Sequence, residues 1–158
     1  MSETADTPGL CAPAPGQVSA TDAFEAGVGI IVFDGVCALC NGWVDFLLAR
    51  DRAQRYRFAA MQSAAGRRLL ATHGLDPDDP ASFLLLEGRG AHTETDAIAR
   101  VLSGLGGVWR LAALGRLLPR GLRDRLYRLV ARNRYGLFGR REACRMPDPA
   151  QQHRFIVD

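Results

Sequence analysis

The sequence predicts a single α/β domain, and three observations support this fold class. The chain has 158 residues, which is the size of one ordinary domain and is long enough to bury a core without disulfides or metals. Its hydrophobic content of 47% and charged content of 23% are close to the average of globular proteins. Short β-branched runs alternate with segments of helical periodicity, which is typical of a sheet covered by helices.

Residues 1–28 are predicted to form a disordered lead-in. They are rich in Ala, Pro, Gly, Ser and Thr and show no periodic pattern. The segment is acidic and has no apolar stretch, so we do not expect a signal peptide. No apolar run reaches the length of a membrane span, and we therefore expect a cytoplasmic protein without a transmembrane segment.

The predicted domain covers residues 29–146 and begins with a strand at 29–33. This run is short, β-branched and apolar throughout, as expected of a strand buried on both faces. A helix follows at 40–52. Its apolar stripe is formed by Cys40, Trp43, Val44, Leu47 and Leu48.

The middle of the chain adds a second strand, a helix and a hairpin. The second strand spans 56–61, and Ser63 is the N-cap of a helix that ends before Gly74. A third strand at 82–87 is joined by a glycine turn to a short fourth strand at 91–94.

The C-terminal part is predicted to be helical. Thr95 and Asp96 cap a helix, which is followed by helices at 108–118 and 122–134 and by a tail at 147–158. The apolar stripe of the last helix is formed by Leu122, Leu126, Leu129 and Val130. The element order βαβαββα is that of the thioredoxin-like minimal fold, with two or three appended C-terminal helices.

The basic residues exclude several kinds of chemistry, because all 20 of them are arginine. Without lysine there is no Schiff-base enzyme, no lysine general base and no Walker-type phosphate loop. Nothing in the sequence indicates an organic cofactor.

Arginines are concentrated in the C-terminal part of the chain. Residues 99–158 contain 13 arginines and four acidic residues. This basic surface, which includes Arg132 and Arg134, could contact a substrate, an acidic partner or a membrane surface. The simpler interpretation, which we favour, is a solvated helix face. Nucleic-acid binding is not predicted, because no recognised module is present.

The chemistry is expected at the segment Asp34-Gly35-Val36-Cys37-Ala38-Leu39-Cys40, between the first strand and its helix. A cysteine in the first turn of a helix faces free backbone N–H groups and the positive end of the helix dipole, which favour its thiolate. We therefore predict Cys37 to be the exposed nucleophile and Cys40, on the buried stripe, to be the shielded resolving thiol. The alternatives are an inert buried pair and a zinc site, for which the usual second cysteine pair is missing. In either case the chain would be a non-enzymatic binding or adaptor module whose basic helices recognise a partner.

Three neighbours of the cysteines have predicted roles. Asp34 either takes the proton of Cys40 or ties down the N–H groups of the turn. Gly35 permits a tight turn, left-handed if required. Trp43 is expected in the core beneath the helix. Further along the chain, Cys144 is either a third redox partner or, more simply, a small buried residue.

These residues resemble the DCC family of thiol-disulfide oxidoreductases. The resemblance rests on Asp34-x-x-Cys37-x-x-Cys40 followed by Asn41-Gly42-Trp43, on residues 58–63 and 95–97, and on 117–120, 131–135 and 138–144. It implies a thioredoxin-like fold and protein-disulfide reductase activity, with a disulfide-containing protein or a small thiol as substrate and a separate recycling reductant. Thioredoxins place a cis-proline before the third strand, and Pro80 is the nearest candidate for that position. Neither a metal nor a cofactor is expected.

Overall fold

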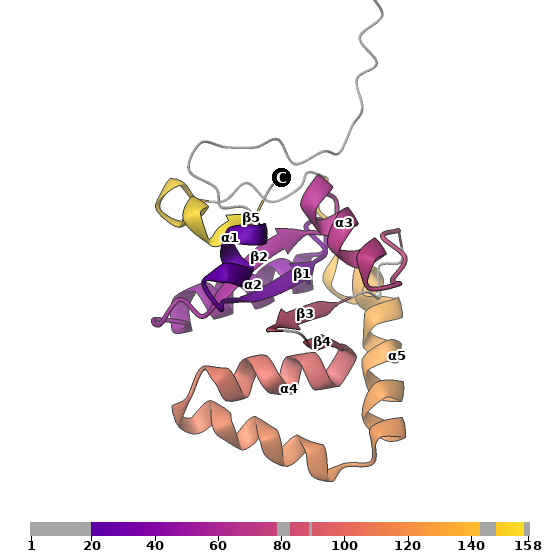
Figure 1. Ribbon diagram of the computed structural model, residues 1–158. Helices are drawn as coiled ribbons and strands as arrows, with labels where there is room; N and C mark the ends of the chain where they lie inside the picture. The colour runs from indigo at the N-terminus through magenta and orange to yellow at the C-terminus, as the bar shows by residue number, and fades with distance from the viewer. Residues whose placement is uncertain (1–19, 79–82, 89, 143–147, 157–158) are drawn as a thin grey trace, which may run out of the picture.

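The computed structural model describes residues 20–78, 83–88, 90–142 and 148–156, and its centre is a five-stranded mixed sheet (Figure 1). The strands are β1 (Gly29–Phe33), β2 (Tyr56–Ala60), β3 (Leu84–Glu87), β4 (Gly90–Thr93) and β5 (Phe155–Ile156). Their order is β4-β3-β1-β2-β5; β1 is parallel to β2 and antiparallel to β3. The predicted α/β, thioredoxin-like fold class is confirmed.

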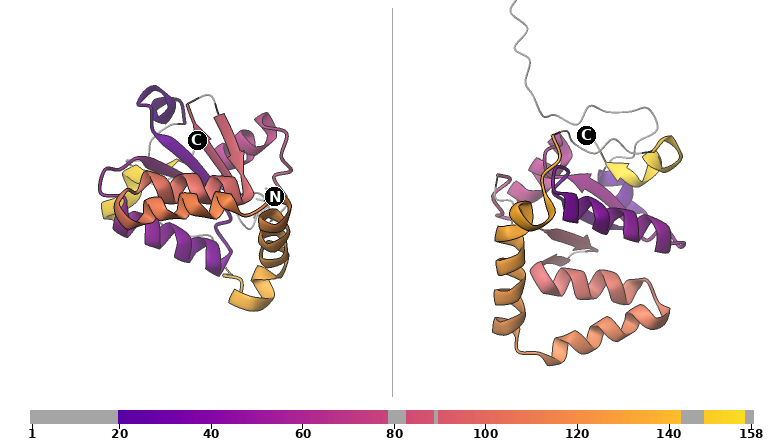
Figure 2. Two further views of the ribbon diagram at one scale, coloured as in Figure 1. Left: turned by 90° about the horizontal axis from the view of Figure 1, so that it is seen from below. Right: turned by 180° about the vertical axis from the view of Figure 1, so that it is seen from behind.

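Helices cover both faces of this sheet (Figures 1 and 2). The α-helices are α1 (Ala20–Glu25), α2 (Ala38–Arg50), α3 (Ala64–Thr72), α4 (Glu94–Gly104) and α5 (Arg120–Phe138). Two 3₁₀ helices are η1 (Gly107–Leu117) and η2 (Pro149–Arg154). The predicted order βαβαββα therefore runs from β1 to α4.

The core has two halves, separated by the fully buried strand β1. Successive side chains of a strand point to opposite faces, so Ile30 and Val32 pack on the side of α1 and α3, whereas Ile31 and Phe33 pack on the side of α2 and α4. Because both faces of β1 are buried, its pairing register with β2 and β3 is fixed. The loop that joins Phe33 to α2 therefore starts from a defined position at the end of the strand.

Within the described residues, both terminal segments contain structure that was not predicted, while residues 1–19 of the predicted lead-in lie outside the described part of the chain. The helix α1 lies in the predicted lead-in, and its Ala23 is buried in the core. In the predicted tail, β5 adds to the sheet in parallel with β2. Arg154 is buried there and forms an ion pair of 2.6 Å with the buried Asp51. A pairing partner about a hundred positions away in the sequence is not visible in local patterns.

The predicted start of α4 is also wrong. The helix begins at Glu94 after the N-cap Thr93, which forms no side-chain cap. The two predicted capping residues have other partners: Thr95 donates a 2.7 Å hydrogen bond to Asp124 of α5, and Asp96 accepts one of 3.2 Å from Arg100 on the next turn of α4. The contact between Thr95 and Asp124 joins α4 to α5.

The appended helices are present, but their bounds and one helix type differ from the prediction. The segment at 107–117 is a 3₁₀ helix that runs beside α4, and α5 lies across the end of this pair (Figure 2). The leucine stripe of α5 faces solvent, and its buried residues are Ala131 and Arg134. Among the described residues, no helix combines the length and the apolar character needed to cross a bilayer.

Candidate active site

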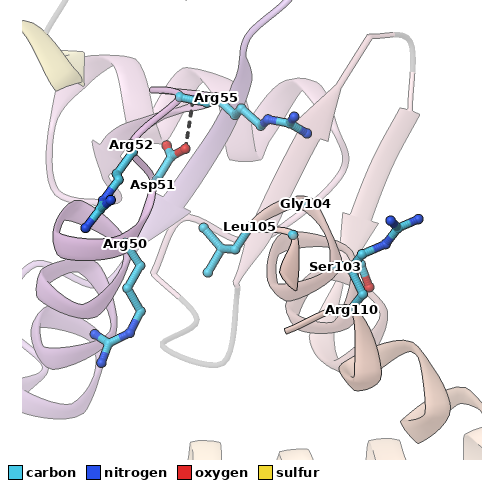
Figure 3. A pocket seen from close by; sticks show the side chains of 10 residues that line it. Arg50, Asp51, Arg52, Arg55, Ser103, Gly104, Leu105 and Arg110 are labelled. Atoms are coloured by element: carbon cyan, nitrogen blue, oxygen red, sulfur yellow. Dashed lines mark hydrogen bonds between the residues drawn. The ribbon is translucent and has the colours of Figure 1, made fainter. Parts of the chain in front are cut away.

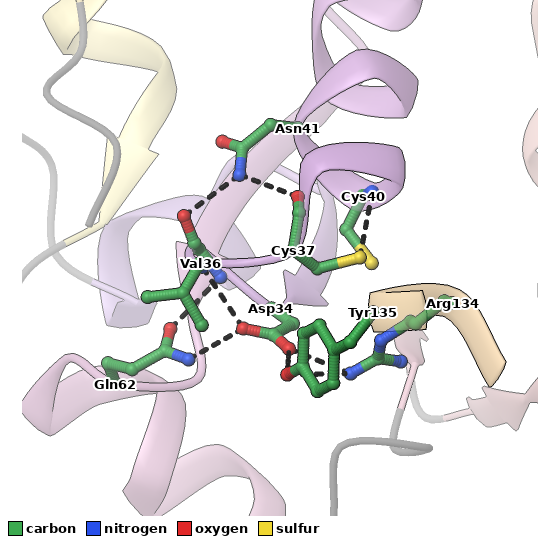
Figure 4. Close-up of polar contacts among 9 residues, drawn as sticks. Asp34, Val36, Cys37, Cys40, Asn41, Gln62, Arg134 and Tyr135 are labelled. Atoms are coloured by element: carbon green, nitrogen blue, oxygen red, sulfur yellow. Dashed lines mark hydrogen bonds and ion pairs between the residues drawn. The ribbon is translucent and has the colours of Figure 1, made fainter. Parts of the chain in front are cut away.

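The two cysteines lie at the N-terminus of α2, as predicted (Figure 4). Cys37 is the N-cap of this helix, and its Sγ accepts a 3.3 Å hydrogen bond from the backbone N–H of Cys40. A sulfur in this position faces the positive end of the helix dipole, which stabilises negative charge. Neither cysteine is in a disulfide.

The exposure of the two cysteines is the reverse of the prediction. Cys37 is 0% exposed, whereas Cys40 is partly exposed. The cause is the segment that follows α5, Gly139 to Arg141, which crosses the start of the motif. Ala38 donates a 3.3 Å hydrogen bond to the carbonyl of Gly139, and Arg141 donates one of 2.7 Å to the carbonyl of Val36. Cys37 and Arg140 form an isolated antiparallel bridge between these bonds.

Replacing Arg141 with proline is expected to uncover Cys37. Proline has no backbone N–H, so the hydrogen bond to the Val36 carbonyl is lost. One backbone hydrogen bond is worth about 1 kcal/mol, and we expect alkylation of Cys37 by iodoacetamide to become roughly fivefold faster. Glu142→Pro is the control, one position beyond the paired backbone. Equal alkylation rates in Arg141→Pro and the unmodified protein would show that this segment does not limit access.

The loop before α2 is held by two amide side chains. The Nδ2 of the buried Asn41 donates hydrogen bonds of 2.8 Å to the carbonyls of both Gly35 and Cys37. The N–H of Gly35 donates to Oε1 of Gln62 at 3.0 Å. Gly35 is buried but is not in the left-handed region, so the turn is tight without unusual backbone. Sequence reasoning assigned no role to Asn41 or Gln62, although both lie in the segments that carry the family resemblance.

Asp34 is buried beneath the cysteines and accepts four hydrogen bonds. Its Oδ1 accepts from the N–H of Val36 at 3.1 Å and from Nε2 of Gln62 at 2.7 Å. Its Oδ2 accepts from Nη2 of Arg134 at 2.7 Å and from the hydroxyl of Tyr135. A carboxylate has about four lone-pair sites, so all of them are engaged. The bond to Val36 is the turn-stabilising contact that was one of its two predicted roles.

Arg134 is the cation of the site, and the prediction that it belongs to a surface is wrong. It is 4% exposed and extends from α5 to Asp34 beside the two sulfurs, whereas Arg132 on the same helix is exposed (Figure 4). Its Nε finds no hydrogen-bond partner among the described residues, so a buried donor remains available. Burial alone would lower the pKa of Arg134, but the hydrogen bond with Tyr135 and the electrostatic interactions with Cys40 and Asp34 raise it above its ordinary value.

Cys40 and Tyr135, which lie near the Cys37 sulfur and the Asp34 carboxylate, both have raised pKa values. Burial raises the pKa of Cys40 well above its ordinary value, and a hydrogen bond to Cys37 raises it further, while Arg134 partly opposes this. Burial and the hydrogen bond to Asp34 also raise the pKa of Tyr135. Cys40 and Tyr135 are therefore both protonated near neutral pH and act as donors, to the Cys37 sulfur and to the Asp34 carboxylate respectively.

An apolar groove of about 480 Å³ borders the cysteine motif on the exposed side of α2. It is lined by Ala38, Leu39, Gly42, Trp43, Phe46 and Phe138. Trp43 is only partly buried: it packs against the core and stacks on Phe46 at 5.4 Å, so its predicted place in the core is only half right. Phe138 brings the end of α5 to the same groove.

A second hollow lies away from the cysteines (Figure 3). It is bordered by Arg50 at the far end of α2 and by Arg110 of η1, whose guanidinium groups point apart, so they do not converge on one ligand.

Two further residues with predicted roles, Pro80 and Cys144, lie outside the described residues. Within the described part of the chain, no group of three or more His, Cys, Asp or Glu side chains could hold a metal ion.

A cysteine pair that begins the helix after the first strand of this sheet defines a thioredoxin-like thiol-disulfide oxidoreductase. The chain belongs to the DCC1-like thiol-disulfide oxidoreductase family, whose model matches residues 31–140 and thus includes Asp34, both cysteines and Arg134.

Two relatives are similar along most of the chain. Uncharacterized protein YuxK of Bacillus subtilis (strain 168) is 39% identical over 127 residues, which cover 80% of this chain and 93% of YuxK. DCC family protein At1g52590, chloroplastic, of Arabidopsis thaliana is 40% identical over 118 residues, which cover 74% of this chain and 69% of that protein. No solved structure gives a significant match.

Proposed function

We propose that this protein is a protein-disulfide reductase in which Cys37 attacks the substrate and Cys40 resolves the intermediate. The observation that carries the proposal is the position of the Cys37 sulfur. It accepts the N–H of Cys40 at the helix N-terminus, and the buried Arg134 lies beside it. The dipole and the guanidinium both favour a thiolate there, while Cys40 remains a thiol.

The reaction proceeds through two exchanges. The Cys37 thiolate attacks one sulfur of a substrate disulfide, and the other substrate sulfur leaves as a thiolate that takes up a proton. Cys40 then loses its proton and attacks the Cys37 sulfur, which forms the Cys37–Cys40 disulfide and releases the second substrate thiol. A separate dithiol or thiol reductant returns both cysteines to the reduced state. This direction suits a reducing compartment such as the cytoplasm.

Asp34 acts in this proposal by positioning Arg134. Its oxygen atoms are fully engaged by Val36, Gln62, Arg134 and Tyr135, so no lone pair is left for the proton of Cys40. The ion pair with Asp34 fixes the Arg134 guanidinium beside the sulfurs. The Nε–H of Arg134 is buried there and has no hydrogen-bond partner among the described residues. Of its two predicted roles, we therefore assign to Asp34 the one in which it organises the loop, and not that of taking the proton of Cys40.

The resolving step is expected to become faster as pH rises. Burial is the largest cause of the raised pKa of Cys40 and persists when Cys37 is bound to substrate. The attacking Cys40 thiolate is then a small fraction at neutral pH, and the rate should rise by roughly tenfold per pH unit. Rapid-quench measurement of mixed-disulfide decay from pH 6 to pH 9 checks this. A rate independent of pH would show that a nearby base removes the proton.

The groove beside the motif favours a protein substrate with apolar residues next to its disulfide. Leu39, Trp43 and Phe138 line it within reach of the partly exposed Cys40. Apolar side chains entering this groove would bring the substrate disulfide to the cysteine pair. Approach to Cys37 also requires Gly139 to Arg141 to move aside, because their backbone is paired with the motif.

The test is reduction of insulin by dithiothreitol in the presence of the purified protein. We expect catalytic amounts to accelerate precipitation of the insulin B chain, and a Cys37→Ser/Cys40→Ser variant to leave the rate at that of dithiothreitol alone. A folded, reduced protein that gives no acceleration would overturn the proposal. Stoichiometric zinc in such an inactive preparation would instead favour a metal-binding adaptor module.

A further inference from the structure

We propose that η1, α5 and the turn between them form a docking surface for membranes that contain anionic phospholipids. The surface consists of two exposed aliphatic rows, the arginines beside them and a pocket at the turn. It is separate from the residues that hold the cysteines, because the inward side of α5 carries Ala131 and Arg134.

The aliphatic row on η1 follows from its helix type. A 3₁₀ helix has three residues per turn, so side chains at every third position lie in one line. In η1 this line contains Val108, Leu111, Leu114 and Leu117, all of which are between 57% and 81% exposed. A monomeric protein in water seldom exposes such a continuous apolar row without a function.

The row on α5 follows the α-helical period and continues from the same turn. It contains Leu122, Leu126, Leu129, Val130 and Leu137, which are 42% to 66% exposed. Leu117, the most exposed of the two rows, and Leu122 lie on either side of the turn at Leu118 and Pro119. The two helices that carry these rows, η1 and α5, meet at this corner of the molecule (Figures 1 and 2).

Arginines accompany both rows, and this charge identifies the occupant. Besides the buried Arg134, the segment 107–138 contains seven arginines and one acidic residue, Asp124, which is engaged by Thr95. Arg125, Arg128 and Arg132 recur at helical spacing beside the leucines of α5, and Arg128 forms an ion pair of 3.4 Å with Glu94. Pairing with a second copy would bring Arg125 and Arg132 of both copies together, while the neighbouring acids Asp124 and Glu94 are already engaged within each copy. Leucines next to arginines on one helix are the pattern of helices that lie in the interface of an anionic bilayer.

A pocket of about 610 Å³ at the turn is suited to a phospholipid headgroup. Four arginines, one acidic residue and the apolar residues of the turn line this pocket. The lining residues are Asp96, Arg100, Arg116, Leu117, Leu118, Pro119, Arg120 and Arg123. Arg100 and Arg116 pair with Asp96, whereas the buried Nε of Arg123 has no partner among the described residues. A phosphate bound there would meet Arg120 and Arg123, while Leu117 enters the acyl region.

The experiment is co-sedimentation of the full chain with vesicles of phosphatidylcholine alone or mixed with phosphatidylglycerol. We expect binding to the mixed vesicles only, decreasing with salt. Leu117→Gln and Leu126→Gln should each weaken it by about tenfold, because a leucine no longer enters the acyl region. Arg120→Gln/Arg123→Gln should weaken it by roughly fivefold or more per arginine. Arg52→Gln/Arg55→Gln, which changes two exposed arginines remote from the turn, should leave it unchanged.

Circular dichroism of each variant verifies folding before the comparison. Absence of binding to the mixed vesicles would overturn the proposal. Binding of Arg120→Gln/Arg123→Gln that equals binding of the unmodified protein would also overturn it. If glycerol phosphate abolished vesicle binding of the unmodified protein and of Leu117→Gln to the same extent, the ligand would be a soluble anion, and the proposal would be wrong. Light scattering that shows a dimer dissolved by Leu126→Gln would assign the surface to a second copy.

Discussion

Replacing Arg134 with methionine is expected to lower the free energy of unfolding by about 3–5 kcal/mol, because the buried carboxylate of Asp34 loses its charged partner. The same change removes the cation that lies beside the sulfurs, so alkylation of Cys37 by iodoacetamide at neutral pH should become slower. Urea denaturation and alkylation kinetics followed by mass spectrometry measure the two effects separately. Arg132→Met is the matched control, an exposed arginine on the same helix.

A second variant separates the structural effect from the electrostatic one. In Asp34→Asn/Arg134→Met both charges are absent, so much of the lost stability should return. The alkylation rate should remain low, because no cation is restored. If the double variant recovered both stability and reactivity, Arg134 would act only by holding α5 in place. If Arg134→Lys, which keeps the charge, reacted as slowly as Arg134→Met, the effect would require the guanidinium geometry.

Replacing Cys37 with serine should reduce the catalysed part of insulin reduction to zero. A serine hydroxyl cannot attack a disulfide at neutral pH, and the other thiol has a pKa raised by burial. The substitution is nearly isosteric in a fully buried position, so the free energy of unfolding should change little. Insulin turnover and urea denaturation of the same preparation provide the comparison. Full activity in a folded Cys37→Ser protein would assign the attack to Cys40.

Local sequence patterns were sufficient for most of the fold. The alternation of short buried strands with amphipathic helices predicted the order from β1 to α4, and the placement of both cysteines at the start of α2. The ends of the sheet could not be predicted in this way. Phe155 and Ile156 look like a short tail, and only pairing with β2 makes them a strand.

The candidate site was predicted less completely, because its parts come from distant segments. Asp34, Cys37 and Cys40 are adjacent in sequence, but Gln62 and Arg134 reach them across 28 and 100 positions. Residue type does not distinguish the buried Arg134 from the exposed Arg132, because both are arginines on the same helix. The helical period could have done so, since Arg134 falls on the side of α5 that includes Ala131. The reversed exposure of the cysteines likewise depends on Gly139 to Arg141.

The most direct test of the account is to map the mixed disulfide that the protein forms with a reducible substrate. Cys40→Ser should accumulate a covalent complex with insulin, and peptide mass spectrometry should find the bond at Cys37, because the thiolate is expected at the helix N-cap. The parallel Cys37→Ser protein should form none. A complex that instead accumulates in Cys37→Ser, joined through the more exposed Cys40, would contradict the assignment of nucleophile and resolving thiol.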